Sequence, residues 1–124
     1  MYRILLADDE GIMLESLKKI IETEYGNECE IHCAKSGRVV VEMAQAYPPD
    51  ICFMDIQMPV MNGYDSTRHI RALERPDIKS MPIIAMSANA FAEDIKLCKE
   101  SGMNEHIAKP IDFGKVLEIL EKYL

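Results

Sequence analysis

Short apolar runs alternate with longer amphipathic segments from one end of the chain to the other. Five runs have the length and composition of strands, at residues 2–7, 28–34, 50–54, 82–86 and 104–108. The third and fourth are apolar on both faces, which indicates strands at the centre of a sheet. The second alternates, which predicts an edge strand whose buried face carries Cys29, Ile31 and Cys33.

The segments between these runs have apolar residues at helical spacing. Five helices are predicted: from 11 to about 25, from the N-cap Ser36 to Pro48, from about 63 to 74, before Gly102, and after the N-cap Asp112. The residues expected to face inward are Leu14, Leu17, Ile20, Ile21, Val40, Met43, Ala44, Tyr47, Ile70, Leu73, Phe91, Ile95, Cys98, Phe113, Val116, Leu117 and Leu120. Strict alternation of strand and helix predicts a parallel sheet covered by helices on both faces.

Charge and composition exclude several functions. The chain has 124 residues, expected to form one domain (1–124), and a formal net charge of −7. It therefore lacks the basic surface that nucleic acids and anionic lipids require, and no nucleic-acid or direct membrane contact is expected. No apolar run is long enough to span a bilayer and no signal peptide is recognisable, so a cytoplasmic location is expected.

The sulfur-containing residues are interpreted as packing residues. The cysteines lie in apolar segments rather than at the spacing of a secreted disulfide framework. Cys29, His32 and Cys33 could begin a zinc site, but no second ligand pair completes a tetrahedral set. Met54, Met58, Met61, Met81 and Met86 are expected to fill the core and anchor loops.

Polar residues follow the carboxyl ends of four predicted strands, where parallel sheets bind ligands. The edge strand offers only Lys35 and Ser36. The others contribute, in chain order, Asp8, Asp9, Asp55, Ser87 and Lys109. Singly, each would be a turn former, a cap or a solvated charge. Together, three carboxylates at one rim repel one another and need a cation.

The cation is expected to be Mg²⁺, because the ligands are oxygens and neither a zinc nor a calcium motif is present. Carboxylates, a hydroxyl and an ammonium group suit phosphoryl transfer onto a carboxylate. Asp55 is the candidate nucleophile, since it ends the most central strand, with Lys109 and Ser87 as candidate contacts of the phosphoryl oxygens. Backbone amides at 56–58 and 88–89 could add donors.

Four motifs resemble one family. They are "LADDE" (6–10), "MDIQMPVMNG" (54–63), "PIIAMSA" (82–88) and "KP" (109–110), in this order and each at a strand end. The chain resembles the receiver domain of two-component response regulators, and most of all the receivers of hybrid sensor histidine kinases. The resemblance implies a flavodoxin-like (βα)₅ three-layer sandwich with strand order 2-1-3-4-5. It also implies phosphoryl transfer to Asp55 from a histidine kinase or a histidine phosphotransfer domain, rather than an enzyme acting on other substrates.

The resemblance also assigns roles to residues. Mg²⁺, or Mn²⁺, would be bound by Asp9, Asp55 and the backbone carbonyl of Gln57, with Asp8 acting through water. Ser87 and Lys109 would contact the phosphoryl group, and the Lys109–Pro110 bond would be cis.

Further roles concern regulation. Ser87 stands where many members have Thr, and His106 where Tyr or Phe is usual, as the two switch positions. His106 could equally be a strand-end histidine without such a role. Gln57 and Asn89 would tune the phosphoryl lifetime. Phosphorylation would shift a two-state equilibrium, and a weak phosphorylation-dependent dimer is conceivable.

Two other functions were weighed. A Mg²⁺-dependent phosphohydrolase with an aspartyl-phosphate intermediate usually has an acid two residues after the nucleophile, but Gln57 stands there. A flavin-binding module needs a polar, uncharged phosphate loop after the first strand, where Asp8, Asp9 and Glu10 would repel an anionic cofactor.

Overall fold

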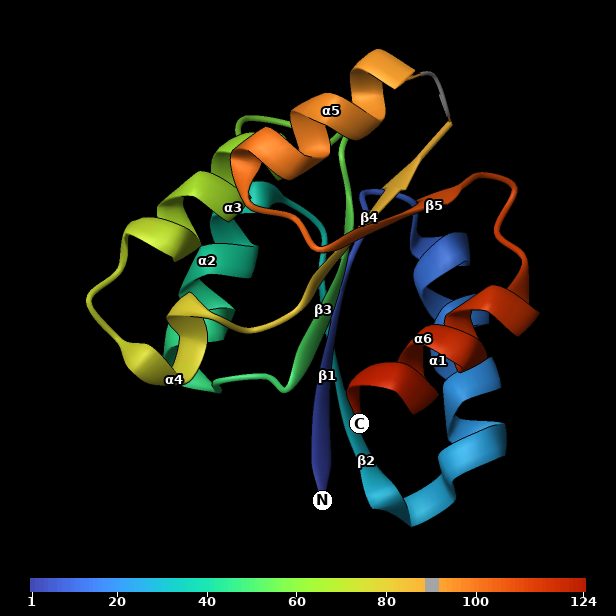
Figure 1. Ribbon diagram of the computed structural model, residues 1–124. Helices are drawn as coiled ribbons and strands as arrows, with labels where there is room; N and C mark the ends of the chain where they lie inside the picture. Colours follow the sequence, from blue (N-terminus) through green and yellow to red (C-terminus); the bar gives the residue numbers. More distant parts are fainter. Residues whose placement is uncertain (89–91) are drawn as a thin grey trace.

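The sheet of the computed structural model, which describes residues 1–88 and 92–124, has five parallel strands. Their order is β2-β1-β3-β4-β5, which confirms the predicted topology. The strands are β1 (Tyr2–Ala7), β2 (Cys29–Ala34), β3 (Ile51–Asp55), β4 (Ile83–Ser87) and β5 (Glu105–Ala108). All five carboxyl ends point away from the end of the sheet where the chain begins (Figure 1).

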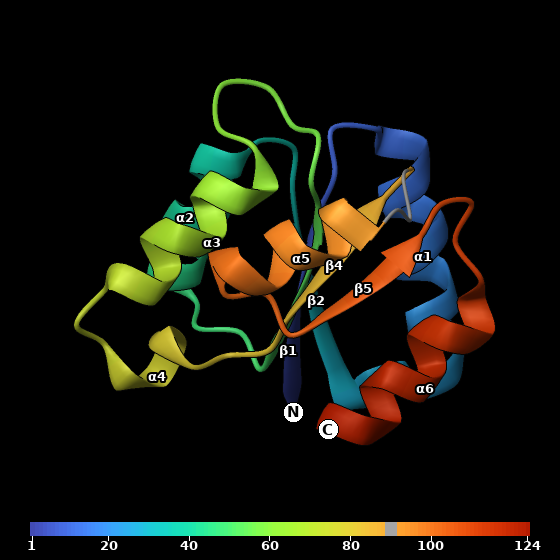
Figure 2. The same cartoon turned by 45° about the horizontal axis from the view of Figure 1, so that its top comes forward.

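Helices cover both faces of the sheet (Figure 1). One face carries α1 (Gly11–Tyr25), which a short 3-10 turn follows at Gly26–Glu28, and α6 (Phe113–Tyr123). The other carries α2 (Gly37–Ala46), α3 (Gly63–Ala72) and α5 (Ala92–Ser101), with the short α4 (Pro76–Lys79) beside α3. Figure 2 shows the same three layers with the carboxyl ends of the strands turned forward. The flavodoxin-like sandwich expected from the sequence is confirmed.

Side chains of the central strands point alternately to the two faces of the sheet, where they pack into two separate hydrophobic cores. Leu5, Met54 and Ala85 pack toward α2, α3 and α5, whereas Phe53 and Ile84 pack toward α1 and α6. Both sets are buried, because β1, β3 and β4 have a strand on either side and helices above and below. The central strands are therefore rigid, and so are the positions of the polar residues that end them.

The caps and one turn act as the sequence predicted. The hydroxyl of Ser36 accepts from Val39 N–H at 3.3 Å, and the carboxylate of Asp112 accepts from Gly114 N–H at 2.9 Å. Gly102 has φ 106°, the left-handed conformation expected of a helix-ending glycine. No helix in the described parts of the chain is long and apolar enough to cross a membrane.

The predicted element boundaries need small corrections. β3 and β4 extend one residue further than predicted, so that Asp55 and Ser87 are their last residues. The third helix ends at Ala72, and α4, which was not predicted, follows it. Arg71 explains this layout, because its guanidinium donates to the carbonyls of Gly102 and Lys79, at 3.0 and 2.7 Å.

Several side chains predicted to be buried are exposed. Cys33 faces α1 where the first turn of that helix leaves an open groove, so its side chain is uncovered. Tyr47 caps the end of α2 and is 53% exposed, because its ring stacks on His32 at the sheet edge rather than entering the core. Phe113, at the first position of α6, and Ile95 on α5 are both 37% exposed. Phe91 lies outside the described residues.

Candidate functional site

Three carboxylates meet at the carboxyl end of the sheet. Ala7 pairs with Met54, so the next residues of β1 and β3, Asp8 and Asp55, stand side by side. One carboxylate oxygen from each of Asp8, Asp9 and Asp55 lies within 4.8 Å of the others. Asp8 and Asp55 are buried, at 0% and 4% exposure, whereas Asp9 is open to solvent. The predicted convergence of these acids is confirmed.

Lys109 reaches the same cluster from the end of β5. Its ammonium group lies 2.9 Å from Asp8 Oδ2 and 3.3 Å from Asp55 Oδ2, with a side chain only 15% exposed. Burial alone would lower the pKa of Lys109. The hydrogen bond to Asp8, together with the charges of Asp55 and Asp8, outweighs burial and raises that pKa. Lys109 is therefore a fixed positive charge, and the Lys109–Pro110 bond that follows it is cis, as expected.

Opposing interactions act on the pKa of Asp55. Burial, followed by repulsion from Asp8, raises the pKa of Asp55 to about 6, although Lys109 and the N–H of Gln57 oppose this rise. The Gln57 N–H donates to Asp55 Oδ1 at 3.2 Å. Asp8 is engaged in a similar way, since its Oδ1 accepts from Glu10 N–H at 2.9 Å and its Oδ2 accepts from Lys109.

The donor set fits a hard divalent cation. Three carboxylates share the cluster with one ammonium group, so negative charge remains in excess at neutral pH. All of the grouped donors are carboxylate oxygens, and Asp9 leaves one side open to water. This is the chemistry of Mg²⁺, which retains waters and prefers few carboxylates.

The loop after Asp55 is closed tightly over the strand end. Gly63 N–H donates to Ile56 O at 2.8 Å, and a Cβ on Gly63 would lie 2.7 Å from the carbonyl oxygen of Asp55. Only glycine fits such a close approach. The side chain of Asn62 then caps α3 by accepting from Asp65 N–H at 2.9 Å.

Val60 is the outermost residue of this loop. It is 95% exposed and has φ 68°, a left-handed conformation that a β-branched residue rarely adopts. The N–H of Met61 donates to the carbonyl of Pro59 at 2.7 Å, so a tight three-residue turn centred on Val60 accounts for this backbone.

The two candidate switch residues lie on one face of the sheet. His106 pairs with Ala85, and Ala108 pairs with Ser87, so His106 sits one step below Ser87 on that face. Ser87 is 7% exposed, and its carbonyl accepts from Lys109 N–H at 2.7 Å. His106 borders a void of about 30 Å³ that lies between α5 and β5. Asn89, the second residue expected to set the phosphoryl lifetime, lies outside the described residues.

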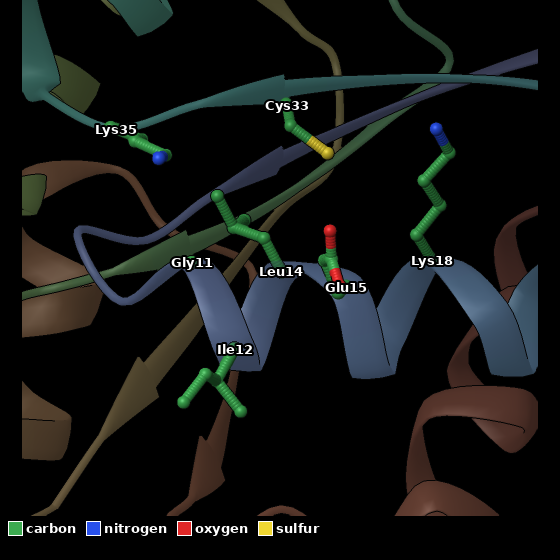
Figure 3. Close-up of a pocket in the computed structure, with 7 residues that line it drawn as sticks. All are labelled: Gly11, Ile12, Leu14, Glu15, Lys18, Cys33 and Lys35. Carbon is green, nitrogen blue, oxygen red and sulfur yellow. The ribbon is translucent and has the colours of Figure 1, made fainter.

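Two features of the site were not recognised from the sequence. The first is Lys35, which the sequence showed at the end of β2 without suggesting a role. It lines a groove between β2 and α1 in which Cys33 and Leu14 point toward each other, while Ile12 points away (Figure 3). The second is the tight packing around Gly63, for which "NG" after a strand was the available signal.

The chain is similar to known proteins in sequence and in structure. The sequence matches the response regulator receiver domain over residues 4–121. It is 34% identical to the hybrid signal transduction histidine kinase L of Dictyostelium discoideum, over 98% of this chain but 7% of that protein. The chain thus spans a small part of this relative.

Solved structures agree with this. The receiver domain of sensor histidine kinase PA1611 from Pseudomonas aeruginosa has 30% identity and a TM-score of 0.86, covering 98% of this chain and 96% of that one. That structure has a magnesium ion coordinated in its active-site cleft. Chemotaxis protein CheY4 of Vibrio cholerae shares the fold, with a TM-score of 0.89 at 24% identity, over 100% of this chain and 99% of that one.

The family match covers nearly the whole chain, and the acids and the lysine of its motifs are those that meet at the strand ends. The chain belongs to the response regulator receiver domain family, the phospho-acceptor domains of two-component signalling.

Proposed function

We propose that Asp55 is the residue that accepts the phosphoryl group. The observation that carries this proposal is its position: Asp55 ends the central strand β3, is 4% exposed, and lies 3.3 Å from Lys109. Its pKa of about 6 leaves the carboxylate mostly ionised at neutral pH, as a nucleophile must be. Asp8 follows β1 rather than ending the central strand, and Asp9 is exposed, so neither is as well placed.

The transfer itself needs little beyond positioning. A carboxylate oxygen of Asp55 forms the new P–O bond, and the donor imidazole nitrogen keeps the electron pair of the P–N bond that breaks. Lys109 neutralises the phosphoryl oxygens from one side, and the Ser87 hydroxyl donates to them once they are in place. Mg²⁺ or Mn²⁺, held by Asp9, Asp55 and the carbonyl of Gln57, would supply further positive charge when bound.

The surface around Ser87 and His106 is proposed to report phosphorylation. Ser87 is on the strand next to that of Asp55, and His106 lies beside the small void between α5 and β5. Asn89 and Gln57 would then influence how water reaches the phosphoryl group. Phosphorylation would bias this region between two arrangements rather than create a new one.

A histidine kinase or a histidine phosphotransfer domain is the proposed donor. The rim of the acid cluster presents two apolar side chains, Ile12 at 85% and Val60 at 95% exposure. Exposed apolar residues beside a reactive site suit a protein partner better than a small molecule alone. A weak phosphorylation-dependent dimer, a cytoplasmic location and one receiver unit over 1–124 complete this proposal. The larger protein in which such a unit acts is proposed to be a hybrid kinase or a response regulator.

A phosphohydrolase is disfavoured by the loop. Gln57 stands two residues after Asp55, with its N–H turned toward the Asp55 carboxylate, and its side-chain amide cannot act as a general acid.

The test is incubation with acetyl phosphate and Mg²⁺ followed by intact mass measurement. We expect one phosphoryl group on the wild type and none on Asp55→Asn. Equal labelling of the variant would remove Asp55 from the proposal, whereas steady turnover of a general phosphoester would favour the hydrolase.

A further inference from the structure

The groove between β2 and α1 includes Gly11, two residues after Asp9, and has a volume of about 530 Å³ (Figure 3). Its lining comes from the first half of α1 and the end of β2. Two lysines contribute to this lining, Lys18 from α1 and Lys35 from the residue after β2. Glu15 from α1 is the carboxylate in the same lining, so the groove carries two positive charges and one negative charge.

The side chain of Lys35 lies along the acidic turn. At its base, Asp8 N–H donates to the carbonyl of Ala34 at 3.0 Å, which ties the turn to the residue before Lys35. At its tip, Lys35 Nζ lies 3.6 Å from the point where a Cβ on Gly11 would be. The ammonium group thus sits over the start of α1, beside the second residue after Asp9.

Lys35 differs from the other cations nearby in having no anionic partner. Lys109 is bound by Asp8 and Asp55, and Lys18 pairs with Glu22 at 3.9 Å. Within residues 1–88 and 92–124, no carboxylate forms an ion pair with Lys35, and its side chain is exposed. Its charge remains available to a ligand, unlike that of Lys109.

We infer that Lys35 is a positioning residue for the incoming phosphoryl group, and this inference rests on the proposed function. Its ammonium attracts the phosphoryl dianion of a donor to the rim, before Lys109 takes over deeper in the site. Such a charge is needed because the chain has a net charge of −7, which repels anionic donors. The same dianion is present in small acyl phosphates and in protein phosphohistidine.

The experiment measures the second-order rate constant of Asp55 phosphorylation, with saturating Mg²⁺ and low ionic strength. The variants are Lys35→Gln and Lys35→Arg. The matched control is Lys19→Gln, an exposed lysine of α1 outside the groove that changes the net charge equally. The probes are acetyl phosphate, a P–O donor, and phosphoramidate, a P–N donor that carries the phosphoryl group without a protein.

With both donors we expect Lys35→Gln to react about 3- to 10-fold more slowly than wild type. Lys35→Arg should retain the wild-type rate, Lys19→Gln should be unaffected, and the deficit should shrink as salt is raised. The half-saturating Mg²⁺ concentration of Lys35→Gln should be unchanged or lower, because a nearby cation has been removed. Its urea midpoint should match that of the wild type.

Several results would overturn the inference. One is an unaffected rate in Lys35→Gln while the wild type is labelled, which leaves the proposed function intact. A second is an equal deficit in Lys19→Gln, which would mean that net charge alone matters. A lower rate with acetyl phosphate but not with phosphoramidate would mean that Lys35 contacts the acetyl group rather than the phosphoryl group. Weaker Mg²⁺ binding by Lys35→Gln would mean that the substitution disturbs the acid cluster. Failure to label the wild type would remove the proposed function and this inference together.

Discussion

Lys109 Nζ lies 3.3 Å from Asp55 Oδ2, so the last strand of the sheet places its cation against the carboxylate that ends the central strand. The same ammonium group also binds Asp8 at 2.9 Å. One buried cation thus contacts two buried carboxylates, and the third acid, Asp9, faces water. The negative charge that remains in excess suits a divalent cation such as Mg²⁺.

Removal of the Lys109 charge should destabilise the domain. In Lys109→Gln, Asp8 and Asp55 lose their common partner, and we expect the free energy of unfolding to fall by about 3 kcal/mol at pH 7 in EDTA. Mg²⁺ should recover part of this loss. Lys115→Gln, which removes an exposed lysine of α6, should change stability by less than about 0.5 kcal/mol. Urea unfolding measures both, and a loss of equal size in the two variants would contradict the buried ion pair.

Neutralisation of Asp55 should stabilise the metal-free domain, in a pH-dependent way. The pKa of Asp55 is raised from 3.8 to about 6, so the folded state holds this proton more tightly than the unfolded chain. The free energy of unfolding of the wild type should therefore fall as the pH rises from 4 to 6, while the Asp55 carboxyl ionises. Above pH 6 the loss should stay constant. We expect Asp55→Asn to be more stable than wild type by about 2 kcal/mol at pH 7.5, and equally stable at pH 4.

This measurement uses urea unfolding in EDTA at both pH values. Mg²⁺ should stabilise the wild type and leave Asp55→Asn nearly unchanged, because binding to the folded state alone raises stability. An Asp55→Asn variant that is less stable than wild type at pH 7.5 would show that the carboxylate is not electrostatically strained.

Gly63 is expected to tolerate no side chain. A Cβ there would lie 2.7 Å from the carbonyl of Asp55 and 2.9 Å from Ile56 Cα, both backbone atoms that cannot move aside. We expect Gly63→Ala to lose about 2 kcal/mol of stability and to slow phosphorylation, because the loop bearing Asp55 must shift. Gly11→Ala is the control, since its Cβ would meet only the tip of Lys35 at 3.6 Å. Equal stability of Gly63→Ala and wild type would refute the close approach.

Val60 should be replaceable by glycine without loss of stability. Its φ of 68° is costly for a β-branched residue, and its side chain is 95% exposed. Glycine relieves the backbone strain but adds freedom to the unfolded chain, so the net gain should be about 0–1 kcal/mol. Thermal unfolding would measure this change. A destabilised Val60→Gly would mean that the valine packs against the domain.

The two arginines of α3 offer a sharp comparison. Arg71 donates to the carbonyls of Gly102 and Lys79 and to Asn104 Oδ1, whereas Arg68 only pairs with Asp65 on the surface. We expect Arg71→Gln to lose about 2–3 kcal/mol, because the carbonyls of Gly102 and Lys79 lose this donor and Asn104 Oδ1 is left with Ile83 N–H. Arg68→Gln should lose less than about 0.5 kcal/mol. Denaturant titration of both variants decides this, and similar values would show that Arg71 does not organise the loops after α3.

The central strands and their terminal residues could be predicted from the sequence, because runs buried on both faces leave little ambiguity. The convergence of Asp8, Asp55 and Lys109 then follows from parallel strands ending at one rim. What could not be predicted is which acid is buried. The sequence does not show that Asp8 is buried and accepts hydrogen bonds from Glu10 N–H and Lys109, whereas the neighbouring Asp9 is exposed to solvent.

The errors fall where burial depends on neighbouring elements rather than on periodicity. Cys33 alternates correctly for a buried face, but the first turn of α1 does not cover it. Tyr47 has helical spacing but lies at the C-cap, where it stacks on His32. Lys35 was visible as a strand-end residue, but its approach to Gly11 depends on how the acidic turn, bonded to Ala34, lies against the end of β2.

The most direct test of phosphorylation at Asp55 is to trap the acyl phosphate chemically. Borohydride reduces an aspartyl phosphate to homoserine, which peptide mass spectrometry locates in the chain. After treatment with acetyl phosphate and Mg²⁺, we expect homoserine at position 55 and at neither Asp8 nor Asp9. Homoserine at Asp9, or none at any aspartate of a protein that had gained phosphate, would contradict Asp55 as the phospho-acceptor.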